Sequence, residues 1–177
     1  MKKILALVLA LMMALTAVAA IAEEAAVSPA EEAMAYTDDE TVAVSEDVPA
    51  YAEDVVADLA VAYLAGDTNL VAAVDEDAAA KCAEILGTDE LTVEEVVSMT
   101  VTGAVEEKTV NFTFATDYTG KESVVLMIGI PAEDGSIEWT LVEAVVNEDG
   151  SVGAILSAEL VEKLQGVEAI VLVVSAK

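Results

Sequence analysis

The sequence has no histidine, no arginine and a single cysteine, Cys82. Such a chain cannot assemble a His/Cys zinc site, a redox thiol pair or a histidine-based catalytic triad from its own residues. Because 34 Asp and Glu face only 7 Lys, the chain lacks the basic surface that neutralises phosphates, and we expect no nucleic-acid partner. Aromatic residues make up only 4%, few for the aromatic platforms of glycoside-cleaving sites. We therefore expect a protein that is not an enzyme.

The first 22 residues have the order of a Sec-type signal peptide. Lys2 and Lys3 precede an uncharged run over residues 4–21, and Ala20 and Ala22 occupy the −3 and −1 positions before Glu23. A run of this length also suits a transmembrane anchor, but its alanine-rich end and clean cleavage pattern favour the signal. Cleavage would yield an extracellular protein, released or loosely retained at the cell surface, with no further membrane contact.

The remaining chain changes composition along its length. Residues 23–48 hold nine acids and no lysine, which predicts a disordered acidic leader because like charges repel and little apolar area can be buried. Alanine is concentrated before residue 90, whereas valine and other β-branched residues dominate afterwards. We therefore expect a helical segment over residues 49–98 and a β-rich domain over residues 99–177.

Two helices are expected in the first of these segments. Apolar residues at helical spacing predict one over residues 50–65, ended by Gly66. The second covers residues 76–86, with Asp75 as its N-cap and Gly87 as its stop. The pattern Thr92-x-x-Glu95 resembles a capping box and predicts one further helical turn.

Alternating or continuous apolar patterns predict the strands of the second segment. Their expected positions are residues 109–114, 124–130, 137–145, 152–156 and 167–174, with a short helix over 158–164. Turns with Asp-Gly, at residues 133–136 and 147–150, indicate hairpins. The expected fold class is therefore α+β: a small N-terminal helical segment, then an antiparallel sandwich of five to six strands with one short connecting helix.

Residues 105–177 also resemble the immunoglobulin-like β-sandwich modules of secreted proteins from Gram-positive anaerobes. The resemblance rests on Phe112-Thr-Phe114, Trp139, the turn Asn147-Glu-Asp-Gly150 and the helical stretch from Ser157 to Gly166. It implies a similar architecture, without the cysteines of antibody domains, and it transfers no active site.

Three aspartates are the candidate metal ligands, with calcium as the only cofactor considered. Asp75 and Asp77 belong to an acidic cluster and Asp149 to a hairpin turn, and oxygen ligands suit calcium. The same residues also have a structural interpretation, because acids favour a helix N-terminus and Asp-Gly favours a turn. Neither stretch has the Asp-x-Asp-x-Asp-Gly pattern of a calcium loop.

Cys82 lies on the apolar face of the second predicted helix. We expect it to be a buried small hydrophobe, with an intermolecular disulfide as the alternative. The functional expectation is a secreted, non-catalytic acidic module that binds a macromolecule at the cell surface or in the medium. A calcium-stabilised module and an electrostatic binder of cationic peptides or proteins are its alternatives.

Overall fold

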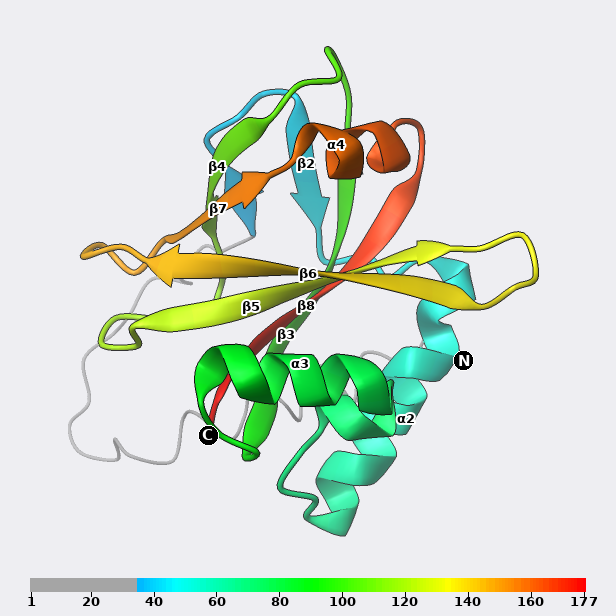
Figure 1. Cartoon of the computed structure of the whole chain (residues 1–177), viewed down its shortest axis with the longest axis vertical. Helices are drawn as coiled ribbons and strands as arrows, with labels where there is room; N and C mark the ends of the chain where they lie inside the picture. The colour runs from blue at the N-terminus through cyan, green and yellow to red at the C-terminus, as the bar shows by residue number, and fades with distance from the viewer. Residues whose placement is uncertain (1–34) are drawn as a thin grey trace, which may run out of the picture. The chain divides into compact units, whose positions relative to one another are not determined.

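The computed structural model describes residues 35–177. Within this range the chain forms one eight-stranded sheet in the order β1-β4-β7-β6-β5-β8-β3-β2, and all its strand pairs are antiparallel (Figure 1). The strands are β1 (Tyr36–Thr37), β2 (Val42–Ser45), β3 (Leu91–Val101), β4 (Lys108–Thr113), β5 (Ser123–Pro131), β6 (Ile137–Val146), β7 (Val152–Leu156) and β8 (Glu168–Ala176). The helices are η1 (Ala50–Ala52), α2 (Glu53–Ala65), η2 (Val71–Ala73), α3 (Glu76–Leu86) and α4 (Ala158–Leu164).

The sheet curls until its two edge strands, β1 and β2, become neighbours. They are consecutive in the chain, yet β1 pairs with β4 and β2 pairs with β3. The Thr37 hydroxyl donates a hydrogen bond to the carbonyl of Val42 across the remaining gap. Asp39 stabilises the connecting turn by accepting hydrogen bonds from the Thr41 amide at 2.8 Å and hydroxyl at 2.6 Å. The sheet is therefore nearly barrel-shaped.

One hydrophobic core fills the inside of this curled sheet. Phe112, Leu126, Ile128 and Val171 are among its fully or almost fully buried side chains. The short helix α4 lies near one end of the sheet (Figure 1) and contributes Leu160, Val161 and Leu164 to the same core. This helix begins at Ser157, whose hydroxyl accepts a hydrogen bond from the Leu160 amide at 3.2 Å.

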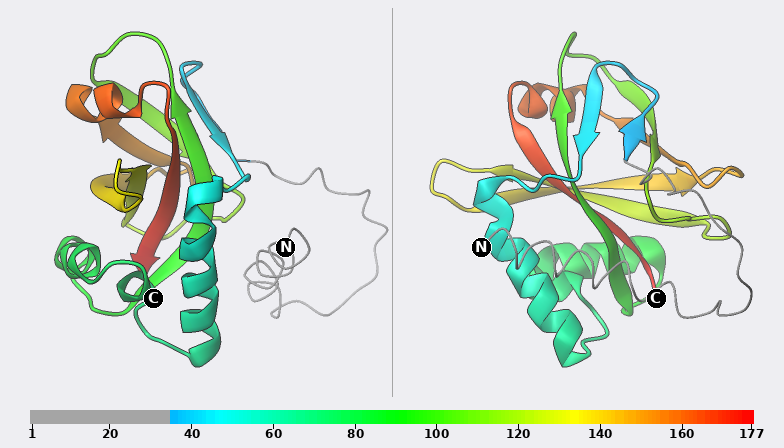
Figure 2. Two further views of the ribbon diagram at one scale, coloured as in Figure 1. Left: turned by 90° about the vertical axis from the view of Figure 1, so that its right-hand side faces the viewer. Right: turned by 180° about the vertical axis from the view of Figure 1, so that it is seen from behind.

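A second apolar layer lies on the outer face of the central strands. Residues 124–129 of β5 and residues 169–175 of β8 are all buried, since one set of alternate residues faces the inner core and the other faces outward. Helix α3 packs over β5, β6, β3 and β8, while α2 contacts η1 and η2 and lies toward the same end of the folded part as α3 (Figure 2). Leu59, Cys82 and Leu91 are completely buried in this helix-covered part of the molecule.

The predicted immunoglobulin-like sandwich is wrong, because a single curled sheet replaces two facing sheets. Alternation along a strand shows that one face is buried, but it does not show what covers that face. The uninterrupted apolar strands likewise suited a sandwich centre. In the structure they are apolar on both sides because helices cover the outside and the curled sheet encloses the inside.

Most of the individual elements match their predicted positions. The structure confirms the helices at residues 53–65, 76–86 and 158–164 and the strands β4 to β8. Both Asp-Gly hairpins are also present, with positive φ angles of 85° at Gly135 and 82° at Gly150.

Two regions were assigned the wrong structure. The disordered leader was predicted to reach residue 48, yet residues 36–45 contain β1 and β2; these short strands gain stability from pairing with distant strands, which local composition does not reveal. The helical turn predicted after Thr92 is part of β3. A β-bulge between Val93 and Glu95 shifts the register there and interrupts the alternation that would have indicated a strand. The rest of the predicted leader and the signal peptide lie outside the described residues.

Candidate functional site

The structure places the three predicted metal ligands in two separate parts of the fold. Asp75 is the N-cap of α3, where its carboxylate accepts a hydrogen bond from the Ala78 amide at 2.7 Å. Asp77 lies in the first turn of the same helix. Asp149 lies in the β6–β7 turn and accepts hydrogen bonds from the Ser151 amide at 3.0 Å and hydroxyl at 2.7 Å. The capping and turn interpretations are therefore confirmed for Asp75 and Asp149.

These local hydrogen bonds also explain the titration of the turn residue. The hydroxyl and amide of Ser151 stabilise the ionised carboxylate and lower the pKa of Asp149 below its ordinary value. Within residues 35–177, no three acidic, cysteine or histidine side chains are grouped as a metal ion would require. The calcium site therefore stays a prediction without a cluster of ligands to support it.

Asp75 and Asp77 do share a groove, which runs between the start of α3 and one face of β6. The groove has a volume of about 160 Å³. Its α3 wall also includes Ala78 and Lys81, and its β6 wall consists of Ile137, Trp139 and Leu141. The lining thus combines two carboxylates and one ammonium with one aromatic and two long aliphatic side chains. This arrangement suits a cationic side chain with an apolar stem, which can contact both walls at once.

Trp139 is held in the groove by its packing against a glycine. The structure leaves its side chain partly buried. Across the sheet it pairs with Gly129 of β5, where an added Cβ would lie 2.5 Å from Cζ3 of the indole. The missing side chain at Gly129 therefore leaves the space that the indole ring occupies.

Tyr51 reinforces the sheet at the same point. Its hydroxyl accepts a hydrogen bond from the Ile170 amide at 2.9 Å and lies 2.9 Å from the Gly129 carbonyl, to which it can donate. Gly129 and Ile170 form the last pair between β5 and β8, so Tyr51 bridges the two strands where they separate. Burial raises the pKa of this phenol, and the hydrogen bond from Ile170 partly offsets the effect.

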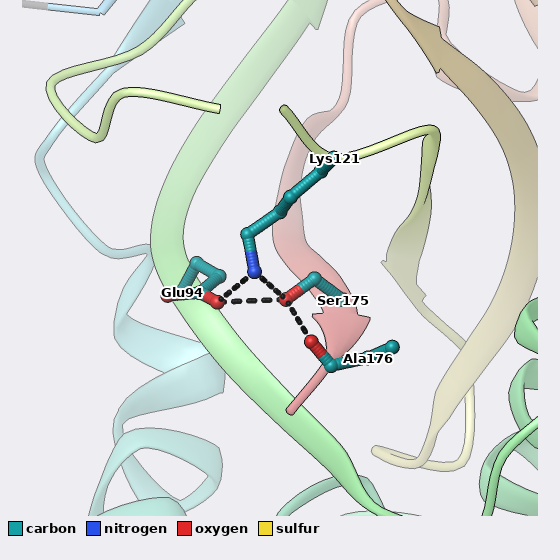
Figure 3. Close-up of polar contacts among 4 residues, drawn as sticks. All are labelled: Glu94, Lys121, Ser175 and Ala176. Atoms are coloured by element: carbon teal, nitrogen blue, oxygen red, sulfur yellow. Dashed lines mark hydrogen bonds and ion pairs between the residues drawn. The ribbon is translucent and has the colours of Figure 1, made fainter. Parts of the chain in front are cut away.

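A second cluster of polar side chains lies near the bulge in β3. Figure 3 shows Lys121, Glu94 and Ser175 in mutual contact. The Lys121 ammonium lies 3.0 Å from a Glu94 carboxylate oxygen and 2.9 Å from the Ser175 hydroxyl, and that hydroxyl donates to the same carboxylate at 2.7 Å. The cluster ties β3 and β8 to the segment between β4 and β5.

This triad contains a serine and a lysine, but its geometry is that of a structural network. The ammonium of Lys121 forms an ion pair with the Glu94 carboxylate at 3.0 Å, and this contact links the β4–β5 segment to β3. Ser175 is only 1% exposed, which leaves little room for a substrate beside its hydroxyl. We therefore assign the triad to linking strands rather than to chemistry.

The partly buried Glu95, at the bulge, and the fully buried Tyr118 are coupled through the charge of the carboxylate. Glu95 accepts a hydrogen bond from the Thr116 amide. Burial raises the pKa of Glu95, the Thr116 hydrogen bonds oppose the rise, and the charges of Glu46 and Glu94 add to it. The Tyr118 hydroxyl is fully buried and, within residues 35–177, lacks a hydrogen-bond partner. Burial, followed by the charges of Glu95 and Glu94, raises the pKa of Tyr118.

Cys82 is confirmed as a buried residue of the helix layer. It is 0% exposed, and burial alone raises the pKa of its thiol to about 11. A thiol in this state is poorly nucleophilic.

Sequence reasoning identified Asp75 and Asp77 but not the groove they line. No signal in the sequence links α3 with β6, because the two elements meet only in the folded sheet. In the described part of the chain, no helix is long and apolar enough to cross a bilayer. Comparison with protein families, curated proteins and solved structures finds no match to the chain.

Proposed function

We propose that this protein is an exported, non-catalytic acidic module that binds basic segments of other proteins through the groove between α3 and β6. The observation that carries the proposal is the groove itself, with Asp75 and Asp77 on one wall and Trp139 on the other. A lysine or arginine side chain can place its charge near the carboxylates and its stem, or its guanidinium plane, against the indole.

The charge of the whole domain supports the same class of partner. Residues 35–177 contain 30 Asp and Glu and five Lys, so the domain attracts cationic partners over a distance and repels anionic ones. Lys81 is the exception within the groove, since it contributes one positive charge next to the two carboxylates.

The proposal that the protein is exported rests on the signal-peptide pattern of residues 1–22. Mass spectrometry of the exported protein should find Glu23 as its first residue.

The groove can be tested by fluorescence because Trp139 is the only tryptophan in the chain. Titration with an oligolysine peptide should change its emission to saturation, and the affinity should fall as salt is raised. Asp75→Asn and Asp77→Asn should each weaken binding several-fold, about the effect of losing one exposed ion pair. Lys81→Ser should strengthen binding.

The choice of variants separates binding from folding. Asparagine is as good an N-cap as aspartate, so Asp75→Asn removes charge while retaining the start of α3. Glu106→Gln, in the β3–β4 loop, is the matched control for charge alone. An unchanged Trp139 signal, or equal effects of the groove variants and Glu106→Gln, would contradict the proposal.

Calcium is the competing ligand for the same carboxylates. Thermal unfolding in CaCl₂ and MgCl₂ at matched ionic strength distinguishes the two possibilities. A rise in Tm that is specific to calcium and is lost in Asp77→Asn would show that the ligand of these carboxylates is a calcium ion rather than a basic segment. Equal responses to both salts would remove calcium as the ligand of these carboxylates.

A further inference from the structure

One edge of β6 has no neighbouring strand along most of its length. β6 pairs with β5 from Ile137 to Val145, but β7 pairs only with residues 144–146. Figure 1 shows β7 diverging from β6 toward α4. Within residues 35–177, residues 137–143 therefore have β5 on one side and no strand on the other.

The hydrogen-bonding groups that point to this free edge can be assigned from the register. The Asn147 amide donates to the Ser151 carbonyl on the β7 side at 2.8 Å. In an antiparallel strand, residues alternate between the two edges, and each directs its N–H and C=O to the same edge. Ile137, Trp139, Leu141 and Glu143 therefore direct their backbone groups to the free edge, whereas the intervening residues bond to β5.

Residues 137–143 themselves carry none of the usual protection against added strands. Natural proteins block exposed edges with proline, lysine, bulges or very short strands. Residues 137–143 contain neither proline nor lysine, and their pairing with β5 shows no bulge. The only charged side chains in the segment are Glu138 and Glu143, both exposed; Glu138 forms an ion pair with Lys163 of α4 at 3.1 Å, whereas Glu143 forms none within residues 35–177. Two copies of β6 would bring like charges together, which opposes self-association but favours a basic strand.

We propose that an extended, basic segment of a partner protein adds to the sheet as a strand beside β6. This inference deepens the proposed function and rests on it, because it assigns the conformation in which the basic segment binds. Strands pair about 4.8 Å apart, so alternate side chains of the added strand continue the face that carries Trp139 and Leu141. Those side chains lie next to the groove that Asp75 and Asp77 line, while main-chain hydrogen bonds supply sequence-independent affinity.

A pair of peptides tests the backbone contribution separately from charge. The first alternates lysine and valine over the length of residues 137–143, with blocked ends. The second has the same sequence but carries N-methyl groups on two consecutive central residues, so that neither of its edges can pair continuously. Their charges are equal. We expect the methylated peptide to bind about tenfold more weakly, the effect of losing a few hydrogen bonds.

Amide hydrogen exchange locates the added strand by its two-residue period. The unmodified peptide should slow exchange at Ile137, Trp139, Leu141 and Glu143, whose amides are free in the structure. It should leave exchange at Thr140 and Val142 little changed, since β5 already holds those amides.

A backbone variant supplies the reciprocal test on the protein. Leu141→Pro removes an amide that points to the free edge, and proline is tolerated at such edge positions. Leu141→Ala is the matched control, because it shortens the side chain and retains the amide. We expect Leu141→Pro to lower the affinity for the unmodified peptide severalfold more than Leu141→Ala does. If the proline variant does not fold, hydrogen exchange in the unaltered protein decides.

The outcomes separate this inference from the proposed function. Equal affinity of the two peptides, or slowed exchange confined to the α3 wall of the groove, would overturn strand addition and retain the acidic groove as the binding site. Failure of both peptides to bind would overturn both proposals. A tenfold difference in affinity between the two peptides, together with slowed exchange at alternate residues of β6, supports both proposals.

Discussion

Gly129 controls where the single tryptophan of the chain lies. An added Cβ would be 2.5 Å from the Trp139 ring, 2.7 Å from Ile137 Cγ2 and 2.8 Å from Ile170 Cγ2. No real Cβ fits at such distances without movement of its neighbours. The residue thus supports both the β5–β6 pairing and the aromatic wall of the groove.

We expect Gly129→Ala to lower the free energy of unfolding by about 1–3 kcal/mol, the usual effect of overpacking. Chemical denaturation measures the change, and the emission maximum of Trp139 should shift because the ring is displaced. Combining Gly129→Ala with Trp139→Leu should cost less than the sum of the two single changes, since the smaller side chain relieves the clash. Strict additivity would show that the indole does not occupy the glycine space.

The folded structure should protect the Cys82 thiol from reagents in solution. The thiol is buried and its pKa is raised to about 11, so an aromatic disulfide reagent should react with it only after unfolding. We expect negligible labelling in buffer and complete labelling in denaturant. Non-reducing electrophoresis should show a monomer, whereas a disulfide-linked dimer would contradict the buried assignment.

At the scale of elements, the bulge in β3 concentrates buried charge. Burial raises the pKa of Glu95 from its ordinary value of 4.5, so the folded protein holds a proton that the unfolded chain releases. The contribution of this group to stability is full below about pH 4.5 and is lost as the pH rises through the raised pKa. The other carboxylates titrate in the same way in the unaltered protein and in a variant that differs only at Glu95. A comparison of the two therefore isolates the contribution of Glu95 to the free energy of unfolding.

Glu95→Gln should therefore unfold with a weaker pH dependence than the unaltered protein. Above the raised pKa the variant should be the more stable of the two, and near pH 4 the difference should disappear. The glutamine oxygen can still accept the hydrogen bond from the Thr116 amide. Urea denaturation across this pH range measures the effect, with the exposed Glu106→Gln as control. A difference that is constant with pH would contradict a raised pKa at Glu95.

The elements also show which information the sequence contains. Helix α3 was predictable because Asp75 and Gly87 mark its ends, and β4 because Val110 and Phe112 alternate with polar residues. β3 was not, since its bulge breaks the alternation. The groove was beyond sequence reasoning for a different reason: Asp75 and Trp139 come together only because α3 packs over the outer face of the sheet at β6. Their separate roles as cap and strand residue could be predicted, but their proximity could not.

At the scale of the whole molecule, charge repulsion works against the compact state. The described residues carry 25 more acids than lysines, and few of the acids form ion pairs. Exposed carboxylates repel one another over about 30 Å at 10 mM salt but over only about 8 Å at physiological ionic strength. The folded protein brings these charges closer together than the unfolded chain does.

We expect the Tm to rise by about 3 °C or more as sodium chloride increases from about 10 to about 300 mM, which corresponds to about 1 kcal/mol for a domain of this size. Choline chloride should give the same rise, because screening does not depend on the identity of the cation. A flat Tm over this range would show that repulsion contributes little.

The position of β8 determines when the chain can fold. This strand comes after the other strands of residues 35–177 along the chain, but it lies between β5 and β3 in the middle of the sheet. Without it, β3 with β2 and β5 with β6 remain separate fragments, each with an open edge. Folding therefore has to wait until synthesis reaches residues 168–176, and its rate is limited by long-range pairing. A chain that has been synthesised only as far as residue 167 therefore exposes two unpaired strand edges, those of β3 and β5, which only β8 can join.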